Sequence, residues 1–226
     1  MNTSIRLCGL FALVMLVGFS SWAHKYVPND GSHVDAAHAL EIADPDLSQV
    51  VYHPVTPATA QLWLTVNGSA GQELYMQLGV PVLDRLEEYR PTLVLLGPGL
   101  PEIDTPLEVP AGLGGVEFPT ADLQAEFFDE HFTGTQSWIL FEQDYPLPEA
   151  GQYFIAAYHP EGEDGKLWMA VGRREEFGFM DILTFRDVVD AVREFHEVLD
   201  ERPPLLTGIL LAISDHLRRV FWFLRP

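Results

Sequence analysis

Histidines close to the start of the chain are the residues whose type and spacing best suit chemistry. Removal of residues 1–23 would make His24 the first residue, where its α-amino group and its imidazole could both bind one metal ion. This chelate is the core of a copper brace, which needs another histidine from elsewhere. His33 and His38 follow closely and could deliver imidazoles around a turn. Because imidazole binds copper, nickel and zinc, we expect a copper or nickel site at His24, His33 and His38.

An ordinary polar lead-in is the alternative interpretation of this stretch. Residues 25–32 read Lys-Tyr-Val-Pro-Asn-Asp-Gly-Ser, which has no pattern specific to metal ligands. Under this interpretation residues 24–47 are a histidine-rich N-terminal segment that binds nothing.

The first 23 residues have the three parts of a secretory signal peptide. Arg6 precedes an apolar stretch over residues 7–19, and Ser21-Trp22-Ala23 supplies small residues around a cleavage point. The apolar stretch is shorter than the roughly 20 residues that cross a bilayer, so we expect cleavage after Ala23, with a retained anchor as the alternative. Arg6-Leu7 stands before Cys8 where a lipoprotein has small residues, and the bulk of the apolar stretch follows the cysteine, which argues against a lipoprotein. The expected location is therefore outside the cytoplasm, in a bacterial periplasm or extracellular.

The chain is strongly acidic. Its net charge is −20 over 226 residues, and loss of Arg6 with the leader makes the mature part more negative still. A surface of this sign repels phosphate, so nucleic acid is excluded as a partner. Cations, polyols and proteins remain as partners, and a role in solubility alone is the alternative.

The middle of the chain, residues 48–174, predicts a mainly β domain. Residues 61–66 nearly alternate between apolar and polar side chains, which predicts one buried and one wet face. Asn67-Gly68 and Asp164-Gly165 are turn signals, each between two predicted strands. Short strands at this spacing favour an antiparallel β-sandwich of jelly-roll type. The candidate strands are Gln49–His53, Gln61–Val66, Glu73–Leu78, Thr92–Leu96, Ser137–Gln143, Tyr153–Tyr158 and Leu167–Val171.

Two segments interrupt this pattern. Residues 81–90 predict a short helix or an ordered excursion between strands. Residues 97–132 predict a long connection rich in Gly, Pro and acids, and a connection of this length is usually functional or loosely packed.

Two blocks resemble the bacterial pre-peptidase C-terminal β-sandwich family. Gln61–Leu78 (Gln-Leu-Trp-Leu-Thr-Val-Asn-Gly onwards) is similar to its early hairpin, and Ala150–Tyr158 with Lys166–Val171 is similar to its closing unit of glycine, aromatic, strand, turn and strand. The resemblance implies a jelly-roll-like sandwich and assigns no functional residue. Thr92–Gly99 stands where the family has an acidic middle strand, so the chain resembles a divergent member.

The C-terminal part, residues 175–226, predicts two amphipathic helices. Val188, Val192, Phe195 and Leu199 recur at helical spacing, and Pro203-Pro204 ends that helix. A second helical run follows over 205–224, where arginines and Phe221-Trp222-Phe223 lie beside an apolar stripe. We expect residues 205–226 to contact a membrane surface or a partner. Packing against the chain's own sandwich is the alternative.

Strand aromatics could form a stacking platform for a sugar. Roughly half of them must face the core if the alternation holds. The candidates are Trp63, Tyr75, Trp138, Tyr153, Tyr158 and Trp168.

The sequence carries no recognisable enzyme signature. Ser48 and Ser137 have no local histidine frame, and Glu142 with Asp144 is a pair that many strands contain. The first hypothesis is therefore an exported, non-enzymatic module that binds an unknown ligand or an envelope protein. The second is a periplasmic protein that binds copper or nickel through His24, and an enzyme is the third.

Overall fold

The structure is a computed structural model that describes residues 24–176 and 179–198. The predicted signal peptide and the second predicted helix over 205–224 lie outside the described residues. The described helices include none that is long and apolar enough to cross a membrane.

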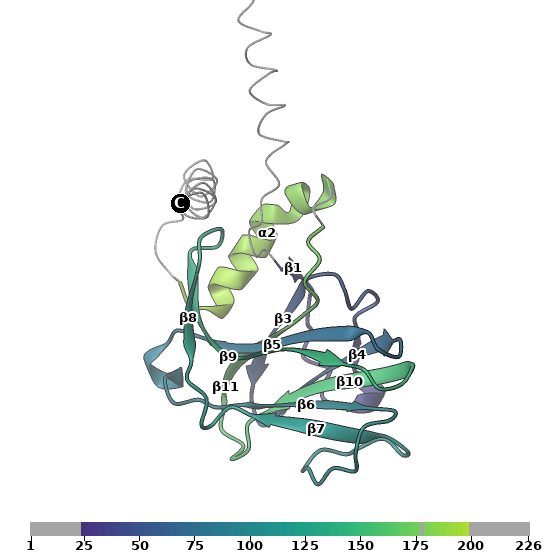
Figure 1. Ribbon diagram of the computed structural model, residues 1–226. Coiled ribbons are helices and arrows are strands. Elements are labelled where there is room, and N and C mark those ends of the chain that lie inside the picture. Colours follow the sequence, from purple (N-terminus) through teal and green to yellow (C-terminus); the bar gives the residue numbers. More distant parts are fainter. Residues whose placement is uncertain (1–23, 177–178, 199–226) are drawn as a thin grey trace, which may run out of the picture. The chain divides into compact units, whose positions relative to one another are not determined.

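Two β-sheets form the body of the domain (Figure 1). Sheet A has six strands in the order β1 (Lys25–Tyr26), β3 (Gln49–Val55), β11 (Gly165–Val171), β5 (Glu73–Pro81), β9 (Thr135–Pro146) and β8 (Glu126–Glu130). Sheet B has five strands in the order β2 (Leu40–Glu41), β4 (Gln61–Gly68), β10 (Gly151–Tyr158), β6 (Thr92–Gly97) and β7 (Gly114–Pro119). All neighbours are antiparallel except β1 with β3 and β2 with β4. The predicted mainly β, two-layer sandwich is confirmed.

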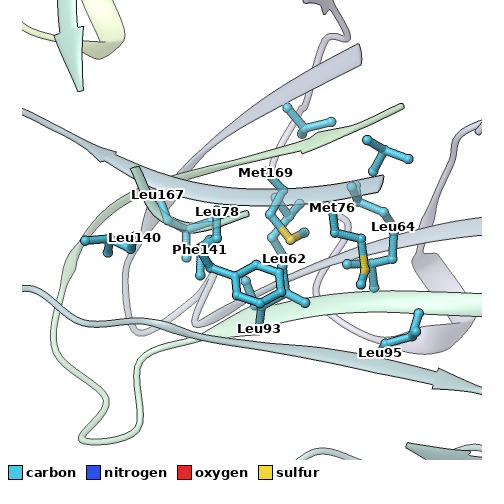
Figure 2. Close-up of a cluster of buried hydrophobic side chains, with 14 of the residues drawn as sticks. Leu62, Leu64, Met76, Leu78, Leu93, Leu95, Leu140, Phe141, Leu167 and Met169 are labelled. Carbon is cyan, nitrogen blue, oxygen red and sulfur yellow. The ribbon is translucent and has the colours of Figure 1, made fainter. Parts of the chain in front are cut away.

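Apolar side chains from both sheets fill the space between them (Figure 2). Strand β5 supplies Met76 and Leu78, and the facing strand β6 supplies Leu93 and Leu95. Each of these side chains is almost fully buried. Alternate residues of each strand therefore build one continuous core, which is the main source of stability in a domain of this size.

All seven predicted strands are present, but the chain does not turn at the two strongest turn signals. Asn67 and Gly68 belong to β4 and pair with β10, and Asp164 directly precedes β11. The chain turns instead near Gly71 and Gly162, whose positive φ angles suit glycine. Strands β4 and β5 lie in different sheets, as do β10 and β11. The two expected hairpins are therefore connections that cross from one sheet to the other.

The outer face of sheet B is largely buried, which corrects the expectation that one face of strand 61–66 is exposed to solvent. Trp63, Phe154 and Tyr158 point away from the main core, yet all three are buried. They are covered by Leu107 and its neighbours in the segment 98–113. The long connection predicted over 97–132 thus covers a sheet, and it also supplies strands β7 and β8.

Helix α2 (Phe179–Phe195) lies over the outer face of sheet A (Figure 1). It ends well before the predicted stop at Pro203-Pro204. Val198 N–H donates to Arg193 O, and Glu197 N–H donates to Glu194 O, which is the Schellman pattern of a helix terminus. Glu197 takes the left-handed position with φ 60°.

Residues 81–90 contain only a short 3-10 helix, Asp84–Leu86. Its Arg85 reaches the end of α2 and pairs with both carboxylate oxygens of Glu197, at 2.9 and 2.5 Å. Lys166 of β11 pairs with the same carboxylate at 2.8 Å. The predicted excursion is thus an ordered support for the helix terminus.

Candidate functional site

His24 directly precedes strand β1 of sheet A. Its side chain is held by one residue just before β3 and one residue of β5. Its Nδ1 is 2.6 Å from Ser48 Oγ, and its ring also bonds to Gln77 of β5. Burial removes water from the imidazole and lowers its pKa to about 4, although the hydrogen bond to Gln77 acts to raise the pKa. The ring is therefore neutral at neutral pH, which is the form that binds a metal.

A row of polar side chains continues from His24 across sheet A. The buried Gln77 amide donates to Glu142 at 3.3 Å. Arg173 in turn pairs with Glu142 at 3.3 Å and with Asp144 at 2.9 Å. The guanidinium also lies 3.9 Å from the centre of the Tyr75 ring. Glu142 and Asp144 are thus engaged by one arginine, an arrangement that serves structure better than acid and base catalysis.

His33 and His38 lie together in the loop before β2. Because Nδ1 of His33 bonds to the carbonyl oxygen of His38 at 2.7 Å, that nitrogen carries the proton and Nε2 faces Asp30 at 3.7 Å. His38 instead bonds to Asp35, which caps the short 3-10 helix Ala36–His38. Each ring is therefore oriented by its own carboxylate.

The three predicted ligands are not gathered into one cluster. Among residues 24–176 and 179–198, no three His, Cys, Asp or Glu side chains converge closely enough to hold a metal ion. His24 contacts Ser48 and Gln77 rather than His33 or His38. The metal site at His24, His33 and His38 stays a prediction, and any complete site needs a donor beyond these contacts, such as the amino group that cleavage would release.

A buried serine–histidine pair was not predicted. Ser137 Oγ is 3.0 Å from Nε2 of His196, and Trp168 donates its indole N–H to the same hydroxyl at 3.2 Å. Nδ1 of His196 bonds to Val192 O at 2.8 Å. Both side chains are buried, and among the described residues no carboxylate is bonded to the histidine. The pair joins the residue after α2 to sheet A. The two residues are 59 positions apart, and no local pattern links them.

Most strand aromatics proposed as a sugar platform are buried. Trp63, Tyr75, Tyr153, Tyr158 and Trp168 all belong to the interior. Trp138 of β9 is the exception and is half-buried. No hydrogen-bond acceptor for its indole N–H is found in the described part of the chain.

Trp138 lies beside Phe127, one of the two large apolar side chains that are most exposed among the described residues. Phe127 of β8 is 49% exposed and Leu123 is 44% exposed. The rings of Phe127 and Trp138 meet edge to face, with centroids 5.4 Å apart. We call Leu123, Phe127, Trp138 and strand β8 the β8 edge. It contains both of the large apolar side chains that are exposed among the described residues.

The β8 edge is also acidic. Residues 120–130 contain Asp122, Glu126, Asp129 and Glu130 and no lysine or arginine. Burial raises the pKa of Glu130 to about 7, whereas Glu126 and Asp129 are exposed. A partner at this edge would meet aromatic rings flanked by carboxylates.

Comparison with known proteins gives distant structural similarity alone. No family model matches the chain, and no curated protein matches it either. The chain is similar to the pre-peptidase C-terminal domain of a collagenase from Bacillus anthracis, with a TM-score of 0.30 and 9% identity over 58% of this chain and 91% of that one. It is also similar to the secreted protein MopE of Methylococcus capsulatus, described as copper-binding, with a TM-score of 0.28 and 10% identity over 67% of this chain and 99% of that one.

Proposed function

We propose that the mature chain is an exported, non-enzymatic β-sandwich module that binds an envelope protein through the β8 edge. The observation that carries this proposal is the exposure of Phe127 and Leu123 in a domain whose other large apolar side chains, in the described ranges, are mostly covered. Exposed apolar groups that gather in one place mark interaction sites. Aromatic residues in particular are enriched at such sites.

Structural roles of the polar groups support a non-enzymatic function. Arg173 neutralises Glu142 and Asp144, and His196 is closed between Ser137 and Val192. These are the groups that would otherwise be candidates for acid, base or nucleophile.

Export is tested by processing. Protein purified from the producing cells should begin at His24 and fractionate with the periplasm or the medium. A chain that keeps residues 1–23 and stays with the cytoplasmic fraction would contradict the proposal. A variant without residues 1–23 is the control, since it should remain in the cytoplasm.

Binding through the β8 edge is tested by site-specific crosslinking in intact cells. A photoreactive phenylalanine in place of Phe127 should give a discrete adduct of higher mass. The same group in place of Glu161, an exposed loop residue on the β10–β11 connection, is the control and should give none. Equal labelling from both positions, or no adduct from either, would remove the β8 edge as the binding surface.

Metal binding is the second candidate function, and the neutral imidazole of His24 favours it. Cleavage after Ala23 would place an amine and this imidazole on one residue, a chelate of the kind that copper and nickel prefer. The mature protein should then bind one equivalent of copper or nickel, measured by metal analysis after dialysis. His24→Ala, or one alanine added before His24, should abolish binding. His33→Ala and His38→Ala then show whether those rings contribute.

A peripheral membrane tether at residues 205–226 is the last element of the proposal. Its aromatic and arginine side chains suit a membrane interface. Deletion of residues 205–226 should move the protein from the membrane fraction to the soluble fraction. Unchanged partition would exclude the tether.

A further inference from the structure

The four edges of the two sheets are protected very unequally. Strands β1 and β2 are each two residues long, so they offer little backbone for another chain to pair with. Strand β7 is longer, but Gly115 N–H donates to Pro101 O at 2.8 Å, and Gly114 packs against the carbonyl oxygens of Leu100 and Pro101. Pro119, which has no N–H, ends that strand. Three edges are thus short or covered.

Strand β8 has none of these protections within the residues that the structure describes. It pairs with β9 in unbroken register from Glu126 opposite Ile139 to Glu130 opposite Thr135, without a bulge. It contains no proline and no lysine, the residues that commonly blunt an exposed edge. Its outer side is also not engaged by any other described strand. Backbone N–H and C=O groups on that side can therefore pair with an added strand.

The side chains of β8 define what such a strand must carry. Successive residues point to opposite faces, so Phe127 and Asp129 share one face with Trp138, and Glu126 and Phe128 share the other. Phe128 packs under α2 with Trp168. One face therefore offers the Phe127 ring and the Asp129 carboxylate, and the other offers the Phe128 ring with the carboxylates of Glu126 and Glu130 at its two ends.

Resting on the proposed function, we propose that the β8 edge binds an extended segment of a partner protein by strand addition, with the pattern basic, apolar, apolar, basic. This pattern is the complement of Glu126-Phe127-Phe128-Asp129, because the apolar residues lie opposite the two rings and the basic residues opposite the two acids. The pattern reads the same in both directions, so it fits a parallel or an antiparallel partner.

A second copy of this chain is a poor occupant of the same edge. Antiparallel pairing of two β8 strands would bring carboxylates of one copy beside those of the other, and each copy carries a net charge of −20. The acids of β8 thus act against self-association, while they attract a basic segment.

The test uses the mature chain and two synthetic peptides, acetyl-Thr-Lys-Val-Val-Lys-Thr-amide and its charge-reversed form with Glu in place of Lys. The basic peptide should bind, and amide hydrogen exchange in residues 126–130 should slow on binding. The acidic peptide should bind at least about tenfold more weakly. Binding without protection of residues 126–130, equal binding of both peptides, or binding of neither would overturn the proposal.

Variants sharpen the result. Phe127→Lys should weaken binding of the basic peptide about tenfold, and the double variant Glu126→Lys with Asp129→Lys should prefer the acidic peptide. Glu161→Lys, a charge change on the exposed β10–β11 connection, is the matched control and should leave the preference unchanged. Sedimentation of the mature chain should show a monomer, and a dimer lost on Phe127→Lys would overturn the choice of partner.

The crosslinking experiment separates the two levels of the proposal. A discrete adduct from position 127 together with failure of the peptides would leave a binding module and remove the basic extended partner. Failure of both would remove the binding module as well.

Discussion

The hydroxyl of Ser137 donates a hydrogen bond to Nε2 of His196 over 3.0 Å, and this bond joins β9 of sheet A to the residue that directly follows α2. Ser137 must be the donor, because Nδ1 of His196 carries the ring proton and donates it to Val192 O. Nε2 is then unprotonated and can only accept. The same hydroxyl accepts a hydrogen bond from Trp168, so three elements meet at one oxygen atom. The helix is therefore held by a contact that exists only while the imidazole is neutral.

Stability should fall on mild acidification because of His196. Burial lowers its pKa from 6.5 to about 4, so the unfolded chain takes up a proton between these values and the folded chain does not. The stabilisation is complete above pH 6.5 and is lost as the pH falls toward 4, by an amount on the order of 3 kcal/mol. Lys166 lies near enough to reinforce the shift.

Urea unfolding at several pH values checks this expectation. His196→Gln should lower stability at pH 7 by about 1–2 kcal/mol through lost hydrogen bonds, and flatten the fall between pH 6.5 and 4. His38→Gln, at an exposed ring, is the control and should keep the slope of the parent. Glu130 acts in the opposite direction, since its pKa of about 7 makes the fold lose stability as the pH rises from 4.5. An unchanged slope in His196→Gln would show that the titration belongs to other groups.

Glu197 should be more tolerant of glycine than of alanine. Its φ of 60° is a left-handed conformation that costs a residue with a side chain about 1 kcal/mol. Both substitutions remove the ion pairs with Arg85 and Lys166. The difference in unfolding free energy between Glu197→Gly and Glu197→Ala therefore reports the energy of the left-handed backbone conformation. Glycine should be the more stable by about 1 kcal/mol. Equal stability would mean that the helix terminus relaxes out of its Schellman geometry.

Gly79 should not accept a methyl group. A Cβ atom at this position would overlap the indole of Trp168 and the carbonyl oxygen of Trp138. Gly79→Ala should therefore destabilise the domain by about 1–3 kcal/mol, measured by chemical denaturation. Trp168→Phe removes part of the obstructing ring, so the double variant should lose less than the sum of the two single losses. Strict additivity would contradict the contact.

The substitution Tyr75→Phe should not lower the stability of the domain. The Tyr75 hydroxyl is buried, and no hydrogen bond of acceptable geometry is found for it among the described residues. Burial and the nearby Glu142 carboxylate both raise the pKa of the phenol, so it stays neutral. Removal of an unpaired buried hydroxyl should leave stability unchanged or raise it by up to about 1 kcal/mol. A clear loss would reveal a hydrogen bond that this arrangement does not contain.

Local sequence predicted most of the strands because glycine and proline bound their aromatic and aliphatic runs. It missed β8, since Glu126-Phe127-Phe128-Asp129-Glu130 places acids at both ends of its apolar pair. It also missed β7, whose start is Gly114-Gly115. Strands β7 and β8 were therefore missed because their residues are of types that are typical of loops.

Turn chemistry could not distinguish a hairpin from a connection between sheets. Asn67-Gly68 satisfies a local rule, but Gly68 lies in β4, where a Cβ atom would overlap the side chain of Leu147. The candidate site was equally hidden. Whether Trp138 or Trp168 faces solvent depends on their contacts with β8 and with residues next to the end of α2, which the pattern within their own strands does not contain. Such contacts arise from tertiary packing, which period and propensity do not encode.

Strand β1 begins at Lys25, one residue after His24, and both of its residues are paired with β3 in sheet A. A peptidase that cuts ahead of His24 needs an extended, accessible substrate around the cut, and the completed sheet withholds one side of it. Under the proposed cleavage after Ala23, we therefore expect the cut to come before β1 pairs with β3. If the chain is exported in this way, the position of a two-residue strand sets the order of cleavage and sheet formation.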